Sequence, residues 1–262
     1  MEPDVLVDLP PAIDVQLRAI GRDLSRVSHL VVTHAHADHL YLPHLRRRAG
    51  LPAGAAEAQV AEDDELARRR VAAPRVGPLP VLTVVASPPV LGRIRQALGP
   101  DAENTMAVRL QPILPGESVA AGAMRFTAVR AHHEVEGDTP YNYVIEGPAE
   151  HRPGERACLF YGCDTGPLRH DAWEVLQRFR FDAVILDATG GDAEPEAFPY
   201  HLTLYGAMDV VAAMREQGLL NQGARIILAH LNAHHWPLHE EAQALVAPLG
   251  WEVAFDGMEL VL

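Results

Sequence analysis

The sequence has little cysteine and no long apolar run, and both absences narrow what the protein can be. Its two cysteines, Cys158 and Cys163, fall in one predicted strand and cannot form a disulfide framework. A reducing cytoplasm is therefore the expected compartment. No apolar run approaches the roughly 18 residues of a transmembrane helix. Residues 1–4 lack the basic start and apolar core of a signal peptide. We therefore expect no membrane partner.

Positive charge is also scarce. The formal net charge of −13 argues against a general nucleic-acid binder, because affinity for the phosphate backbone comes from lysine and arginine. A small anionic substrate remains compatible with this charge, since bound divalent metals reverse the local field. With 48% hydrophobic and 22% charged residues, the 262-residue chain can form one large α/β domain or two small ones.

The densest group of polar side chains follows the apolar residues 30–32, which predict a buried strand. His34 and His36 are two positions apart, so they lie on one side of an extended segment and can share one metal. Asp38 and His39 follow once the chain turns and can point to a second metal. Imidazole and carboxylate are standard ligands of zinc and related metals. The alternative is a polar strand-to-helix turn rich in histidine, but the pattern favours a metal site.

This His-x-His-x-Asp-His pattern resembles the signature of the metallo-β-lactamase superfamily. Three further segments resemble that family in order: Asp8 after a short strand, Tyr161-Gly-Cys-Asp164, and His230 after Arg225-Ile-Ile-Leu-Ala. The resemblance covers residues 4–262 and implies an α/β fold, the four-layer αββα sandwich, as a single domain over residues 1–262. The family's usual first strand is not found. The sheet edge that this leaves can pair with another chain, so a homodimer is compatible with the sequence.

Residues 53–80 resemble the family least. Their acidic and basic runs indicate a solvated helix with internal charge pairing. The alternative is a lid that supplies an arginine to an anionic substrate.

Turn residues and apolar periodicity divide the chain into alternating strands and helices. The predicted strands cover residues 4–8, 81–85, 106–114, 124–131, 141–146, 157–162, 183–186, 224–229, and a final pair at 251–255 and 258–261. The predicted helices cover residues 13–20, 40–48, 87–98, 170–179, 201–217 and 238–246.

The resemblance also implies a ligand set for two divalent metal ions. The first ion would take His34, His36 and His133, the second Asp38, His39 and His230, with Asp164 between them. His132 remains an alternative to His133, because both follow the same predicted strand. Zinc suits this set of imidazoles and carboxylates best, and manganese or iron are compatible with it. Asp8 and Thr33 are expected to orient the ligating imidazoles by hydrogen bonds.

Two further histidines resemble positions in the branch that contains phosphoribosyl cyclic phosphodiesterase and the tRNA 3′-processing endonuclease. His201 begins a His-Leu-Thr-Leu segment, and His234 lies in His230-Leu-Asn-Ala-His. Each is expected to be catalytic together with Asp164, stabilising developing charge or protonating a leaving alkoxide. The alternatives are a helix N-terminal residue for His201 and a solvated loop for His234.

The sequence therefore predicts a dinuclear metal-dependent hydrolase that cleaves a small or cyclic phosphodiester through a hydroxide bridging the metals. A lactonase or other carboxylic-ester or amide hydrolase is the second hypothesis, since it would use the same metals. A non-catalytic metal-binding accessory protein is the third.

Overall fold

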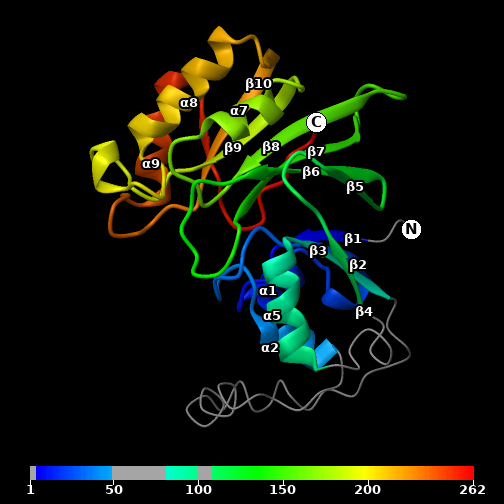
Figure 1. Ribbon diagram of the computed structural model, residues 1–262. Helices are drawn as coiled ribbons and strands as arrows, with labels where there is room; N and C mark the ends of the chain where they lie inside the picture. Colours follow the sequence, from blue (N-terminus) through cyan, green and yellow to red (C-terminus); the bar gives the residue numbers. More distant parts are fainter. Residues whose placement is uncertain (1–3, 49–80, 100–107) are drawn as a thin grey trace. The chain divides into compact units, whose positions relative to one another are not determined.

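The computed structural model describes residues 4–48, 81–99 and 108–262 (Figure 1). The chain divides into two compact units, residues 1–112 and 113–262. The predicted insertion at 53–80 lies outside the described residues, so its two interpretations stay predictions. In the described residues, no helix is long and apolar enough to cross a membrane.

The first unit contains a four-stranded parallel sheet in the order β1-β2-β3-β4. Its strands are β1 (Asp4–Val7), β2 (Val27–Val31), β3 (Leu82–Ala86) and β4 (Val108–Pro112). Its helices are α1 (Ile13–Ala19), α2 (Leu42–Arg48) and α5 (Pro88–Leu98). Helix α5 begins where the sequence predicts, because Ser87 caps it and prolines occupy its first turn.

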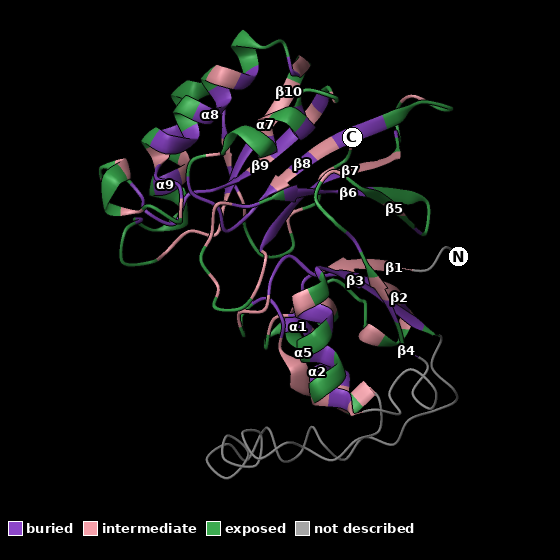
Figure 2. Cartoon of the chain, viewed as in Figure 1, coloured by how far each residue is buried: buried purple, intermediate pink, exposed green. Residues whose placement is uncertain are grey.

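Alternate residues of these strands form the core of the first unit. Leu30, Val84 and Leu110 lie on one face of the sheet and pack with Leu45 of α2 and Ile94 of α5. Figure 2 shows this buried face as purple segments of the strands and of α5. The two-residue period of a strand places the residues between them on the opposite face.

The second unit contains a seven-stranded mixed sheet in the order β11-β10-β9-β8-β7-β6-β5. Its strands are β5 (Ser118–Ala121), β6 (Met124–Arg130), β7 (Tyr141–Pro148), β8 (Arg156–Gly162), β9 (Phe181–Asp187), β10 (Leu220–Ala229) and β11 (Glu252–Val253). Strands β5 to β8 pair antiparallel, whereas β8 to β11 pair parallel.

Three helices cover one face of this sheet: α7 (His170–Leu176), α8 (Leu204–Glu216) and α9 (His239–Val246) (Figure 1). Val211 of α8 and Leu176 of α7 pack on Phe160, Val184 and neighbouring strand residues. Each unit is thus a sheet with helices on one face, and the predicted α/β class is confirmed.

Strand direction decides where the polar residues of the second unit meet. Strand β6 runs antiparallel to β7, and β7 runs antiparallel to β8, so β6 and β8 point the same way. Strands β9 and β10 are parallel to β8. The carboxyl ends of β6, β8, β9 and β10 therefore lie along one edge, which is where ligands bind in open α/β sheets.

Several predicted boundaries differ from the structure. Strand β5 was not predicted, because four residues with two alanines give almost no periodic signal. Helix α8 begins at Leu204 instead of residue 201, since Thr203 is its N-cap. The predicted final strand pair is wrong: β11 is two residues long and pairs with β10, and residues 258–261 form no strand.

Candidate metal centre

In the first unit, Asp8 organises the histidine segment that follows β2. It is 5% exposed, and its Oδ1 accepts the backbone N–H of Thr33 at 2.8 Å. Its Oδ2 accepts the Nδ1–H of His39 at 2.8 Å and the Thr33 hydroxyl at 2.9 Å. With the proton of His39 held on Nδ1, the lone pair lies on Nε2, where a metal can take it. The predicted role of Asp8 and Thr33 in orienting the imidazoles is thus seen in these hydrogen bonds.

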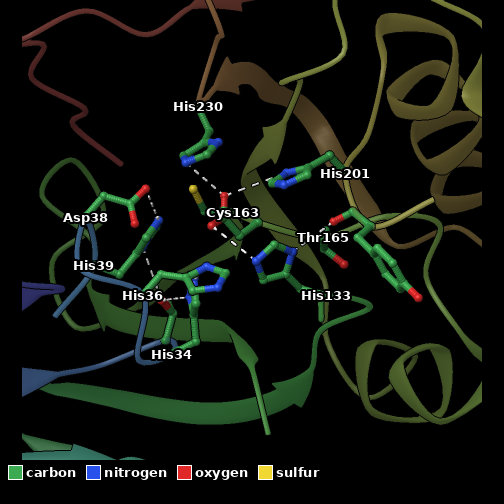
Figure 3. A network of polar contacts seen from close by, with 12 residues as sticks. His34, His36, Asp38, His39, His133, Cys163, Thr165, His201 and His230 are labelled. Atoms are coloured by element: carbon green, nitrogen blue, oxygen red, sulfur yellow. Dashed lines mark hydrogen bonds and ion pairs between the residues drawn. The ribbon is translucent and has the colours of Figure 1, made fainter. Parts of the chain in front are cut away.

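His34 and His36 lie next to one another in the same segment (Figure 3). The Thr33 hydroxyl donates to Asp8, so it accepts Nδ1–H of His34, 3.0 Å away. The lone pair of His34 then lies on Nε2, which is 3.1 Å from Nδ1 of His36. Asp38 is more exposed, with its Oδ2 3.7 Å from Nε2 of His39. The four motif residues therefore gather coordinating atoms in a single short segment.

In the second unit, Asp164 lies at the centre of three imidazoles. Its Oδ1 is 2.9 Å from Nε2 of His230, and its Oδ2 is 3.8 Å from Nε2 of His133. The Nδ1–H of His133 donates to the Tyr200 carbonyl at 3.1 Å, which places its lone pair on Nε2. Figure 3 shows His133, His201 and His230 with their rings turned toward a common point.

Asp187 and Thr189 complete this group, and the sequence analysis did not single them out. Asp187 is 0% exposed at the end of β9, and its Oδ2 accepts Nδ1–H of His201 at 2.7 Å. It also accepts the backbone N–H groups of Thr165 and Thr189. The Thr189 hydroxyl donates to the His230 carbonyl, so it accepts Nδ1–H of His230 at 2.8 Å.

The ligand atoms of Asp164, Asp187, His201 and His230 all lie within 4.8 Å of one another. His230 and His201 are stacked, with ring centroids 5.8 Å apart and 7° between the ring planes. His234 lies outside this group. Its backbone N–H donates to the side-chain oxygen of Asn232, and the residue is exposed. Its catalytic role stays a prediction.

His132 has different partners from His133. Its Nδ1–H donates to the Pro167 carbonyl at 3.0 Å, and its Nε2 accepts from Arg169 at 2.8 Å. The lone pair on Nε2 of His132 thus accepts a hydrogen bond from the guanidinium of Arg169, whereas Nε2 of His133 points to Asp164. Within the second unit, this geometry favours His133 as the ligand.

Three residues of these groups have left-handed backbones. Asp8, Asp164 and His230 have φ values of 60°, 50° and 57°, and in the described part of the chain they are the non-glycine residues with positive φ. A left-handed conformation costs a non-glycine residue about 1–2 kcal/mol. Each lies just beyond a strand, where the backbone turns and sends the side chain to the carboxyl edge. Such strain is characteristic of functional sites.

The donor sets fit divalent metal ions. In the second unit the proton of His230 sits on Nδ1, which faces the Thr189 hydroxyl, so the lone pair on Nε2 of His230 faces Oδ1 of Asp164 at 2.9 Å. Two such acceptors repel unless a cation or a shared proton lies between them. Imidazole nitrogens with one or two carboxylates, and no thiolate in either set, suit zinc and neighbouring metals.

Comparison with known proteins identifies the family. A family model described as a beta-lactamase superfamily domain matches residues 3–231. The chain belongs to the metallo-β-lactamase superfamily. It is therefore a member of a family of metal-dependent hydrolases, and the predicted resemblance and fold are confirmed. No curated protein matches the sequence.

Several solved structures share the metallo-β-lactamase fold. A diphosphatase of the PhnP family has a TM-score of 0.62 at 19% identity, with 98% of this chain and 79% of that chain covered. Zn²⁺-bound PqqB from Methylobacterium extorquens has a TM-score of 0.62 at 19% identity, covering 100% and 83%. Human tRNase Z, short form, has a TM-score of 0.52 at 15% identity, covering 96% and 85%. The TM-scores show a shared fold, whereas sequence identities this low do not identify the substrate.

Proposed function

We propose that the protein is a dinuclear metal-dependent phosphodiesterase that acts on a small or cyclic phosphodiester. His34, His36 and His133 would hold one ion, Asp38, His39 and His230 the other, and Asp164 would contact both. Family membership and the donor geometry within each unit support this assignment.

The observation that carries the reaction type is the contact between His201 and Asp187. The 2.7 Å hydrogen bond to a fully buried carboxylate places a proton of His201 on Nδ1 and fixes the orientation of the ring. With Nδ1 facing Asp187, Nε2 is the nitrogen of His201 that can carry a second proton and pass it to the alkoxide that leaves when a phosphodiester is cleaved. The side chain of His201 is partly exposed and lies beside Asp164, so it could reach a substrate bound at the proposed ions.

When bound, two divalent ions would supply positive charge and would lower the pKa of a bound water to near neutrality. The protein's own residues have separable tasks. Asp8, Thr33 and Thr189 hold imidazoles in the tautomer that coordinates, and His201 supplies a proton. Asp38 would act as a ligand and not as a base, because a carboxylate bound to metal is a poor proton acceptor.

Metal content and substrate class together test this function. Elemental analysis of the full-length protein should give two divalent ions per chain. Turnover of bis(p-nitrophenyl) phosphate should exceed turnover of a chromogenic lactone or carboxylic ester. Two ions with ester or lactone cleavage alone would assign the protein to carbonyl hydrolysis instead. No bound ion after repletion would contradict both activities.

A further inference from the structure

A hollow in the second unit lies directly beside His133. It encloses about 290 Å³ between the end of β6 and the loop before α7. Its lining includes His132, His133, Glu134, Arg130, Arg169 and Tyr200. Pockets for small molecules begin at about this volume, and a few convergent polar groups set what they bind. The size suits one substituent of a substrate whose reacting group lies at His133.

Arg169 is held in this hollow by a neutral partner. The Nδ1–H of His132 donates to the Pro167 carbonyl, so its Nε2 is the acceptor for the Nη2–H of Arg169 at 2.8 Å. The backbone N–H of His132 is itself fixed by the Thr165 hydroxyl at 3.0 Å. An acceptor without charge orients the guanidinium and leaves its positive charge uncompensated.

The charged side chains near Arg169 form hydrogen bonds or ion pairs with other groups. Glu134 accepts the Tyr200 hydroxyl, which raises the pKa of Tyr200 above its ordinary value. Asp138 accepts the Thr139 N–H at 2.5 Å, and Arg130 lies 3.5 Å from Asp171. Among the residues that the structure describes, no carboxylate forms an ion pair with Arg169. The hollow therefore presents an oriented guanidinium that is in no ion pair, although Glu134 and Asp138 also line it, in a chain that contains no lysine.

We propose that Arg169, oriented by His132, binds an anionic substituent of the substrate that is separate from the group being hydrolysed. This inference rests on the proposed function, because it places the scissile group at His133. Arginine suits the task, since its planar fork matches both carboxylate and phosphate. Arg169 is then a specificity-determining residue, and His132 is a positioning residue that acts through it.

A matched set of substrates tests this assignment. Three p-nitrophenyl phosphodiesters share the scissile bond and differ in the second ester: propyl, carboxyethyl or phosphonoethyl. The wild-type protein should have a higher kcat/KM for the two substrates whose second ester group (the arm) is charged than for the propyl substrate. Arg169→Gln should reduce that preference about 10- to 100-fold, mainly through KM, because one charge-assisted contact is lost. Arg169→Lys should restore part of it, and His132→Leu should lose part of it.

Arg180→Gln is the control, because this guanidinium donates to the Phe179 carbonyl outside the hollow. Its preference among the three substrates should equal that of the wild-type protein. If Arg169→Gln lowers kcat for all three substrates and keeps their ratio, Arg169 has a structural role and the inference is wrong. The arm that shows the larger preference identifies the anion as carboxylate or phosphate.

Calorimetric binding separates this inference from the proposed function. Propylphosphonate and its carboxyethyl and phosphonoethyl counterparts are titrated into the metal-loaded, full-length protein. The charged arms should bind more tightly than propyl, and Arg169→Gln should remove that difference. This result would support the inference even if no phosphodiester were turned over. Equal affinities for all three phosphonates in the wild-type protein would overturn it.

Discussion

At the scale of the residue, the position of the proton on each histidine ring decides which nitrogen can bind a metal. Asp8, Asp187 and Thr189 each accept Nδ1–H of one histidine, and each thereby fixes where the lone pair lies. Asp8 was expected in this role, because it follows a strand as the family's aspartate does. Asp187 was not, since a single aspartate at the end of a strand forms no motif with residues so far along the chain. Its role becomes visible only when β9 and the His201 loop are placed together.

We predict that Asp8→Asn weakens metal binding about 10- to 100-fold, the usual cost of losing such a partner. Asparagine tolerates the left-handed backbone at φ 60°, so the turn should survive. Its amide would present N–H toward Nδ1 of His39, and the proton of His39 would then move to Nε2, the coordinating atom. Competition with a chromophoric chelator measures the affinity.

Asp14→Asn is the control for this experiment, because it removes a carboxylate of the same unit that pairs with Arg47. Its metal affinity should equal that of the wild-type protein. Unchanged affinity in Asp8→Asn would mean that this hydrogen bond does not set the tautomer of His39.

Asp187 should act on turnover through His201. General acid catalysis by a positioned side chain contributes about 10²- to 10⁴-fold, and we expect Asp187→Asn to lose at least the lower part of that range in kcat. His201→Ala should lose as much or more, and the double variant should be no slower than His201→Ala. Steady-state kinetics of the four proteins form the cycle. Fully additive losses would show that the two residues act independently.

At the scale of the element, strands and helices with strong local signals were predictable, and those shaped by the tertiary fold were not. Helix α5 follows from Ser87 and two prolines, and the structure places its start there. The start of α8 was misplaced by three residues, because Leu202 continues the apolar pattern although the chain there is a loop. That loop is what allows Nδ1 of His201 to reach Asp187. The error thus falls at the functional site.

The cap of α8 can be tested directly. Thr203 is 1% exposed, and its hydroxyl accepts the backbone N–H of Gly206 at 3.2 Å. Thr203→Ala should lower the free energy of unfolding by about 1 kcal/mol, the typical value of an N-cap. Thr203→Ser keeps the acceptor and should lose less. Urea unfolding of the three proteins gives these values, and equal losses for alanine and serine would indicate that packing of the methyl group dominates.

For the whole molecule, the sequence predicted the fold through one motif and the order of a few segments. The αββα fold could not be built from periodicity, because nothing in the sequence says how two sheets are paired. The resemblance supplied it, and the family match confirms the membership on which that prediction rests. The substrate stayed open for the same reason, since every motif concerns ligands for the metals. The residues of the hollow around Arg169 belong to no motif.

Metal removal should destabilise the protein, because an ion that binds the folded chain and not the unfolded one stabilises the folded state. Ligand present at 100 times its dissociation constant stabilises a folded protein by about 2.7 kcal/mol. In a chain of this size, each kcal/mol corresponds to about 2–4 °C in Tm. Treatment with a chelator should therefore lower Tm by roughly 5–10 °C, and added zinc should restore it. Differential scanning calorimetry measures the shift. If chelation removed the metal and left Tm unchanged, the ions would not couple to folding, and the proposal that folded-state ligands hold them would be wrong.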